Sequence, residues 1–293
     1  MNKSIRLLVG MLALAVAAAA NAREVDRTID AAADGHVDIV NISGSVEVLG
    51  WSSNSVRVTG DLGDRVEELI LERDGDHVLV KVKVPRNNSN NISSDLVVRV
   101  PEDSSIDVST VSADITVEEV AGEQTLHTVS GDVITESGSD LSAQSVSGDV
   151  DVSGDGSETE TSATTVSGDL TLVDIAGAVA AEAVSGDIDI TGGAFERVTL
   201  NSVNGEIYFV GALENDGKLT AETVNGDVDV EFTDEISARI DIDTFNGDID
   251  NCFGPEPERT SRYTPGLELS FTEGSGEGRV TISTLNGDID ICR

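Results

Sequence analysis

A six-residue motif occurs nine times in this chain and constrains its fold more than any other feature of the sequence. The motif has an aliphatic residue (Phe245 in one copy), then Ser or Asn, then Gly, then a carboxylate, as in TVSGDV (128–133) and TLNGDI (284–289). Successive copies lie 17 to 21 residues apart, except for a last step of 40. Repetition at this period predicts an array of similar structural units. The glycine position, which is alanine in the first copy, is occupied by Ala113, Gly131, Gly148, Gly168, Gly186, Gly205, Gly226, Gly247 and Gly287.

Apolar and polar residues alternate on both sides of each motif. In the copy at 223–228, Leu219 and Ala221 precede the motif, whereas Val228 ends it and Val230 follows it, always with a polar residue between them. Alternation with a period of two predicts half-buried strands. The glycine supplies the backbone freedom that a sharp corner between two strands requires. Each repeat is therefore predicted to be two strands joined by a turn.

Stacking these repeats gives the predicted fold. Each repeat is expected to lie ~4.8 Å from the preceding one, so that the inner faces form one continuous core. The prediction is an all-β solenoid, or β-helix, of about nine rungs of 17–21 residues, with an N-terminal β cap; antiparallel meanders or a sandwich are the alternative. The position before the motif glycine holds the same residue type in neighbouring repeats, as expected for side chains that form hydrogen-bonded ladders. The residues before the glycine are Ser130, Ser147, Ser167 and Ser185, then Asn204, Asn225, Asn246 and Asn286.

The two cysteines occupy equivalent positions. Cys252 and Cys292 each lie five residues after a motif glycine. A disulfide is the expectation for an exported protein, and it requires Cα atoms within ~7 Å. The two rungs should then be adjacent, and the 40-residue step should contain a loop excursion at 253–279, in which Leu267–Phe271 and Arg279–Ser283 could pair as a hairpin. Two free thiols are the alternative.

The first 101 residues lack a recognised copy of the motif. Residues 1–22 have a basic start, an apolar run and an Ala-Asn-Ala site, which predict a bacterial secretory signal peptide. Residues 23–101 alternate like strands, with a hairpin turn at Asp74-Gly75, and are interpreted as an N-terminal capping region. The repeat solenoid is assigned to 102–293. We expect no transmembrane segment in the mature chain, which would be periplasmic or extracellular, at the cell surface.

The charge balance excludes several classes of protein. With 18 Lys and Arg against 55 Asp and Glu, the formal net charge is −37. Such a chain cannot neutralise phosphates, so no nucleic-acid partner is expected. Two Cys and three scattered His do not build a zinc finger or an iron–sulfur site.

The chain resembles a family of bacterial envelope proteins with β-strand repeats, known as "putative adhesins" and otherwise of unknown function. The resemblance rests on GSVEVLGW (44–51), on LVVRVP (96–101) and on the repeated TVSGDV and TxNGDI motifs. The chain is also similar to the auto-transporter adhesin head domain, and this similarity implies a β-helix. Adhesion is implied only by the name of the family, and the resemblance implies no catalytic residue in this chain.

A carboxylate follows the glycine position in every copy. In five copies a second Asp stands two residues later on the same face. One interpretation is structural, because such an Asp can accept backbone N–H groups and fix the corner. The other is a line of divalent cations, with Ca²⁺ as the candidate cofactor. The metal candidates are Asp149, Asp151, Asp187, Asp189, Asp227 and Asp229.

Other chemistry is weakly indicated. A polysaccharide-active β-helix enzyme would use paired carboxylates, but Trp51, Tyr208 and Tyr263 are few platforms for sugars. A repeated Thr before the aliphatic residue is similar to ice-binding arrays, although a small residue at a corner explains it better. His36, His77 and His127 are interpreted as ordinary surface or strand residues. The predicted function is an acidic, exported, non-enzymatic envelope protein, an adhesin or interaction scaffold with an unidentified protein or glycan partner; a Ca²⁺-dependent binding module is the alternative.

Overall fold

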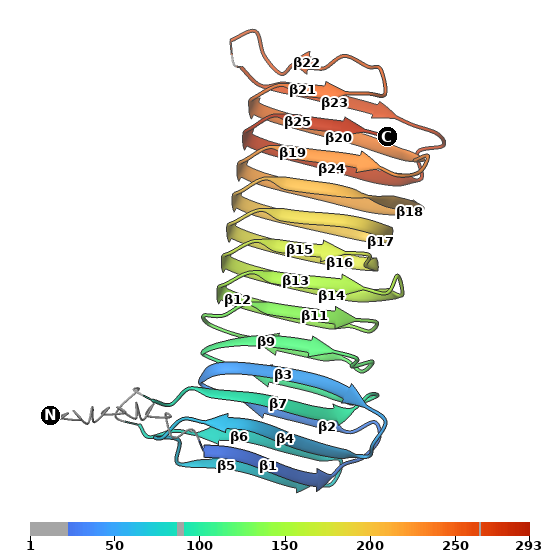
Figure 1. Cartoon of the computed structure of the whole chain (residues 1–293). Helices are drawn as coiled ribbons and strands as arrows, with labels where there is room; N and C mark the ends of the chain where they lie inside the picture. The colour runs from blue at the N-terminus through green and yellow to red at the C-terminus, as the bar shows by residue number, and fades with distance from the viewer. Residues whose placement is uncertain (1–22, 87–90, 264) are drawn as a thin grey trace, which may run out of the picture.

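The computed structural model describes residues 23–86, 91–263 and 265–293, so the predicted signal peptide lies outside the described residues. Every regular element in these ranges is a β-strand. The strands stack along one axis into an elongated body with two long faces (Figure 1). The predicted all-β class and the solenoid-like stacking are confirmed.

Twenty-five strands are present in the described ranges. The first nine are β1 (Arg23–Asp30), β2 (His36–Val40), β3 (Ser43–Trp51), β4 (Ser55–Leu62), β5 (Glu68–Asp74), β6 (His77–Lys83), β7 (Ser94–Pro101), β8 (Ser105–Ser109) and β9 (Ser112–Glu118). The middle strands are β10 (Gln124–His127), β11 (Val133–Ser137), β12 (Leu141–Ser147), β13 (Val150–Gly154), β14 (Glu158–Ser167), β15 (Leu170–Val173), β16 (Ala176–Ser185), β17 (Ile188–Asn204) and β18 (Ile207–Asn225). The last are β19 (Val228–Phe232), β20 (Ala238–Asn246), β21 (Ile249–Asn251), β22 (Glu258–Arg259), β23 (Leu267–Thr272), β24 (Gly278–Asn286) and β25 (Ile289–Cys292).

Equivalent residues of successive repeats lie side by side in parallel register. Val133 pairs with Val150, Val150 with Leu170, and Leu170 with Ile188. Because the side-chain period of a strand is two, this register sends the same columns inward in every repeat. We use "rung" for the two strands that flank one motif turn.

The core is a continuous aliphatic column between the two faces. Ile188, Ile207 and Val228 are almost fully buried, as are the residues two positions after them. Three of the few aromatic side chains, Phe195, Phe209 and Phe232, contact one another in tilted and edge-to-face arrangements inside the upper part of this core. No rung could bury its inner face alone, so the stack is the unit of stability.

Glycine is required at the corner because backbones approach closely there. A Cβ at Gly226 would lie 2.0 Å from the carbonyl oxygen of Gly205 in the neighbouring rung. At Gly205 it would lie 2.0 Å from the carbonyl oxygen of Gly186. The contacting atoms are backbone, so they cannot move aside without shifting the rungs.

Near each end of the body, two strands are inserted out of sequence order. Near the N-terminus, β2 lies between β6 and β8, and β3 lies between β7 and β9. Near the C-terminus, β24 lies between β18 and β20, and β25 lies between β19 and β21. The expectation that each repeat lies on the preceding one is therefore wrong for the last two motif copies. At the other end, β2 and β3 separate the first repeat from β6 and β7, an arrangement that the motif pattern does not predict. An inserted strand satisfies its backbone hydrogen bonds on both sides, which an edge strand cannot do.

Antiparallel strands occur at both ends of the body. The predicted hairpin at Asp74-Gly75 is confirmed, because β5 and β6 pair antiparallel around that turn. The predicted hairpin of Leu267–Phe271 with Arg279–Ser283 is wrong. Strand β23 pairs antiparallel with β20, whereas β24 is parallel to β18 and β20. The slot between β18 and β20 gives β24 two partners, and the hairpin would have given it only one.

Candidate functional site

An exposed column of aliphatic and aromatic side chains follows one corner of the solenoid. Its members are the central residues of the nine motifs, and each is between 39% and 48% exposed. We call it the corner column: Val111, Val129, Val146, Val166, Val184, Val203, Val224, Leu285 and Phe245, in stacking order. Repeated partial exposure of the same apolar position is unusual, since apolar side chains exposed singly need no explanation but contiguous ones mark interaction sites.

A hollow of about 270 Å³ lies beside the corner column. Val166, Val184 and Val203 form one side, and Thr164, Glu182 and Asn201, two positions earlier on the same strands, form the other. Small motif residues, Thr165, Ala183 and Ser202, line its floor. The arrangement is a shallow groove with one apolar wall and one polar wall.

The threonine column that forms this floor is buried. Thr165 Oγ1 donates to the carbonyl oxygen of Gly148 at 3.1 Å, and Thr223 Oγ1 donates to that of Gly205 at 3.2 Å. These hydroxyls satisfy corner carbonyls instead of facing solvent, which confirms the corner role. An ice-binding array needs exposed hydroxyls, so the likeness to such arrays does not extend to the structure.

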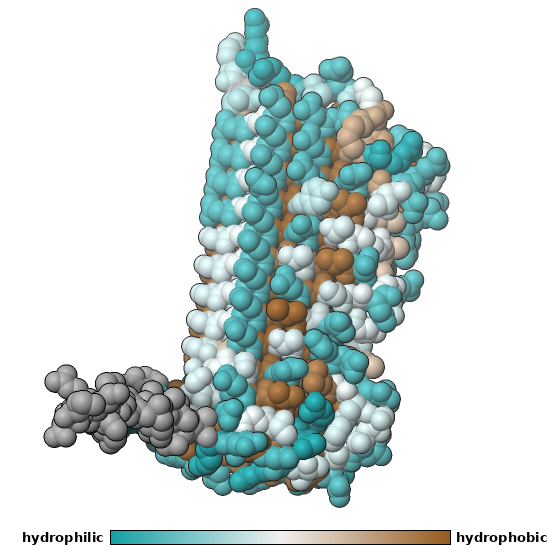
Figure 2. Space-filling view, in the orientation of Figure 1, coloured by the Kyte–Doolittle hydropathy of each residue, from teal (hydrophilic) through white to brown (hydrophobic). Residues whose placement is uncertain are grey.

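The carboxylates that follow the glycine form a ladder along the next column. Asp149 Oδ1 accepts the backbone N–H of Asp169 at 2.8 Å, and Asp227 Oδ1 accepts that of Asp288 at 2.7 Å. Seven such bonds connect neighbouring rungs, with acceptors Asp114, Asp132, Asp149, Asp169, Asp187, Asp227 and Asp288. Figure 2 shows straight hydrophilic lines of side chains along the long axis of the body, as regular stacking of equivalent residues produces. One oxygen of each group thus has a structural partner in the next rung.

The second Asp of each metal-candidate pair has different neighbours along the stack. Thr171 separates Asp151 from Asp189, and Tyr208 separates Asp189 from Asp229. The pairs Asp149/Asp151, Asp187/Asp189 and Asp227/Asp229 are therefore not joined into one continuous double row. Only toward the C-terminal end do second Asp residues adjoin, where Asp290 pairs with Asp229 and with Asp250.

This adjacency perturbs two carboxyl groups. Burial raises the pKa of Asp229, hydrogen bonding with Asp290 opposes this shift, and the neighbouring charges of Asp227 and Glu206 add to it. Burial also raises the pKa of Asp290, with further contributions from Asp229 and Asp250. Asp229 and Asp290 lie in direct register on β19 and β25, and a proton on either group can form a hydrogen bond to the other.

The Asp229–Asp290 pair lines a hollow of about 210 Å³ together with Tyr208 and Cys292. An aromatic ring and two carboxyl groups are components of a polysaccharide-active site. Glycosidases, however, separate their two carboxyl groups by ~5 Å or more. Carboxyl groups that are close enough to share a proton lie nearer to each other than this separation.

A larger hollow, of about 420 Å³, lies where the rungs return, and five of its eleven lining residues are acidic. Its carboxylates are Glu102, Asp103, Glu119, Glu136 and Asp155, and the remaining lining residues are Val, Ala, Ser and Gly. This lining offers acids without an aromatic platform.

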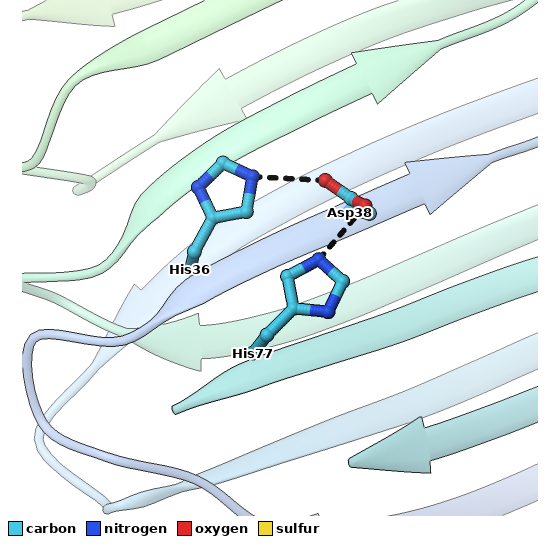
Figure 3. Close-up of side chains that lie close together, drawn as sticks. All are labelled: His36, Asp38 and His77. Atoms are coloured by element: carbon cyan, nitrogen blue, oxygen red, sulfur yellow. Dashed lines mark hydrogen bonds and ion pairs between the residues drawn. The ribbon is translucent and has the colours of Figure 1, made fainter. Parts of the chain in front are cut away.

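Near the N-terminal end, His77 meets two side chains from a distant part of the sequence. His36 and Asp38 lie two positions apart on β2, and His77 lies on β6 in direct register with His36. The Nε2 atoms of His36 and His77 contact the two oxygens of Asp38, at 2.9 and 2.8 Å (Figure 3). Among the described residues, these three form a group whose potential ligand atoms all lie within 4.8 Å of one another.

The interpretation of all three histidines as ordinary residues is therefore incomplete, since His36 and His77 form this cluster. The missed signal is a tenth, divergent copy of the motif, NISGSV (41–46). Gly44 pairs with Ala113 in the glycine column, which places the strand of His36 inside the stack. Strand β6, which carries His77, has no copy of the motif, so it could not be aligned with the repeats in this way.

The predicted disulfide is present. Cys252 and Cys292 are joined with their Cα atoms 4.9 Å apart. The bond connects the last rung, which contains β21, to the inserted strand β25 beneath it.

A family model named Toastrack DUF4097 matches residues 45–292, which is most of the chain. This chain belongs to the Toastrack DUF4097 family. The resemblance to β-strand-repeat envelope proteins is thereby confirmed. No curated protein matches the Toastrack chain.

Several solved structures resemble this Toastrack chain at low identity. A "putative adhesin" from Bacteroides fragilis is 11% identical with a TM-score of 0.46, over 92% of this chain and 97% of that one. A "putative adhesin" from Parabacteroides merdae is 10% identical with a TM-score of 0.29, over 92% and 97%. A "putative lipid binding protein" from Parabacteroides distasonis is 13% identical with a TM-score of 0.29, over 93% and 98%. Within the described residues no helix is long and apolar enough to cross a membrane.

Proposed function

We propose that this Toastrack protein is exported to the bacterial envelope and acts there as a rigid, non-enzymatic scaffold that binds a protein partner. The signal-like start of the sequence and the Cys252–Cys292 disulfide support export, because disulfides persist in oxidising compartments. The antiparallel strands β1 and β4 support the interpretation of the N-terminal region as a cap, since they cover edges that would otherwise pair with other chains.

The corner column carries the proposal. Nine apolar side chains in one line, each exposed by 39–48%, offer an apolar ridge that no other part of this chain covers in the described residues. Glycans are bound mainly by aromatic platforms, whereas aliphatic ridges pack against apolar side chains of proteins. The column therefore favours a protein partner over a glycan.

Charge indicates the chemistry of that partner. The formal net charge is −37, and the groove beside Val184 has Glu182 on its polar wall. A cationic partner surface would be attracted from a distance and would neutralise this field on contact. The partner is accordingly a protein that presents apolar side chains flanked by Lys and Arg.

Site-specific photo-crosslinking in producing cells tests the proposal. A photoreactive residue at Val184 should crosslink to one basic envelope protein, whereas the same residue at Thr171, on the opposite face, should not. The crosslink should disappear in a V166T/V203T background and at high salt. Equal labelling from both positions, or none from Val184, contradicts the proposal. Export is checked in the same cells by locating the protein outside the cytoplasm with its cysteines oxidised.

A Ca²⁺-dependent binding module is a second candidate, supported by the adjacent carboxyl groups of Asp229 and Asp290. Their pKa values are raised, so their charged forms are disfavoured and a cation would stabilise them. The candidate ligands remain Asp149, Asp151, Asp187, Asp189, Asp227 and Asp229. Millimolar Ca²⁺ should then raise the melting temperature relative to EDTA, and identical melting curves would remove this candidate.

A further inference from the structure

The cluster of His36, Asp38 and His77 is held by three neighbouring strands. His36 and Asp38 point to the same side of β2 because they are two residues apart. His77 comes from β6, and its ring lies parallel to that of His36, with centroids 5.4 Å apart and an interplanar angle of 12°. On the other side, Ser105 of β8 pairs with His36, and its Oγ lies 2.9 Å from His36 Nδ1. Both imidazoles thus direct Nε2 toward one carboxylate (Figure 3).

We propose that His36, Asp38 and His77 bind a divalent transition-metal cation, with Zn²⁺ as the best-matched ion. This inference is independent of the partner binding proposed above. Two imidazole nitrogens and one carboxylate oxygen are a ligand set that zinc sites use, with water in the fourth position. The strongly oxygen-preferring Ca²⁺ would not select two histidines.

The geometry permits convergence on one ion. Ligand atoms bound to a tetrahedral Zn²⁺ at ~2.0–2.1 Å lie roughly 3.4 Å apart. The three candidate ligand atoms lie within 4.8 Å of one another. Small side-chain rotations therefore close the site without a change in strand register.

The hydrogen-bond partners also suit metal binding. In the absence of an ion, each neutral imidazole can donate Nε2–H to Asp38. When an ion takes the Nε2 lone pairs, the protons of the rings reside on Nδ1. The Nδ1 of His36 then donates to Ser105 Oγ, which can change from donor to acceptor. Such an outer contact orients a ligating histidine.

The cluster is accessible and lies in an acidic environment. The side chains of His36, His77 and Asp38 are 44%, 43% and 33% exposed. Asp107 of β8 is in register with Asp38, and Asp74 of β5 is in register with His77. The negative charges of these carboxylates attract a cation from solution.

Zinc titration of the EDTA-stripped mature chain tests the inference by calorimetry. One Zn²⁺ should bind per chain, and Co²⁺ in the same site should give the visible absorption of a low-symmetry complex. Millimolar Ca²⁺ should not displace the zinc. Binding should weaken as the pH falls, because protons compete for the imidazole nitrogens.

Four variants separate this site from the acidic ladder. H77Q keeps an amide donor for Asp38 but removes one metal ligand, so it should abolish the tight binding of one Zn²⁺. D38N should have the same effect. S105A should weaken binding about tenfold. H127Q, which alters the third histidine outside the cluster, should bind like the wild type. Absence of binding, displacement by Ca²⁺, or equal binding by folded H77Q and wild type would each overturn the inference.

Discussion

The side-chain amide of Asn246 donates a 2.8 Å hydrogen bond to Oδ1 of Asn286, a residue 40 positions later in the sequence. Asn286 in turn donates to Asn225 at 2.8 Å, and Asn225 donates to Asn204 at 2.8 Å. The ladder therefore runs 204, 225, 286, 246, out of sequence order. This order shows that the last segment of the chain fills a slot that the preceding turns leave open.

The disulfide locks that inserted segment. It closes a loop of 40 residues, for which the chain-entropy model gives a stabilisation of about 4 kcal/mol. We expect the C252S/C292S double variant to lose up to this amount at the C-terminal end. Hydrogen exchange should show the loss of protection in β20, β21 and β25 and leave β12–β16 unchanged. Equal protection in both proteins would show that the disulfide does not hold the insertion.

The glycine column predicts a severe and local steric effect. G226A places a Cβ 2.0 Å from the carbonyl oxygen of Gly205, and rungs must separate to accommodate it. We expect a destabilisation of at least about 2 kcal/mol, measured by chemical denaturation. In G138A the nearest atom is the mobile carboxylate of Asp155, so this control should cost less than about 1 kcal/mol. Similar losses in both variants would contradict the proposed close approach.

The Asp229–Asp290 pair predicts an unusual dependence of stability on pH. Because the folded-state pKa of each group is raised, the folded chain binds the proton more tightly than the unfolded chain. The stability that these two groups contribute to the fold is fully present at pH values below their unfolded-state pKa of ~3.9. It is lost as the pH rises through their folded-state pKa. D290N should thus be more stable than the wild type at neutral pH, by about 0.5 kcal/mol, and not at pH ~4. Thermal melting across this range measures the difference, and a D290N variant that is less stable at neutral pH would contradict it.

Asp241 should show the opposite behaviour. A hydrogen bond from Ser270, followed by Arg239, lowers the pKa of this carboxyl. The stability that Asp241 contributes to the fold is present at pH values above its unfolded-state pKa of ~3.9. It is lost as the pH falls through the lowered folded-state pKa. D241N should therefore cost roughly 0.5 kcal/mol at neutral pH, and this cost should vanish in acid. A neutral-pH cost that persists unchanged in acid would assign it to packing instead of charge.

The corner column should be dispensable for folding. V184T changes a side chain that is 43% exposed, so we expect a change within about 0.5 kcal/mol. V198T places a hydroxyl at a position that is 1% exposed and should cost ~1–3 kcal/mol. Denaturant midpoints of the two variants make the comparison. A large loss in V184T would indicate that the column stabilises the fold instead of serving a partner.

The sequence predicts the repeated part of the molecule well because each column repeats one physical requirement. Gly226 must be small, Thr223 must reach a corner carbonyl, and Val228 must face the core, so periodicity alone locates them. The insertions at the two ends could not be predicted in this way. Exchanging the last two rungs preserves every column, and a pattern of columns contains no information on the order of rungs.

The histidine cluster shows the same limit. His36 and His77 are 41 positions apart, and they meet because β2 is inserted beside β6. The divergent glycine copy at Gly44 could have placed His36 in the stack. Strand β6 has no motif, so nothing in the sequence sets its register.

Distances between spin labels on the corner column test the rung order most directly. With rungs ~4.8 Å apart, labels at Val146 and Leu285 should be about 24 Å apart, and labels at Val146 and Phe245 about 29 Å apart. The inserted arrangement requires the pair with Leu285 to be the shorter one. A shorter distance from Val146 to Phe245 would mean that the chain winds in sequence order, which contradicts the inserted C-terminal rung.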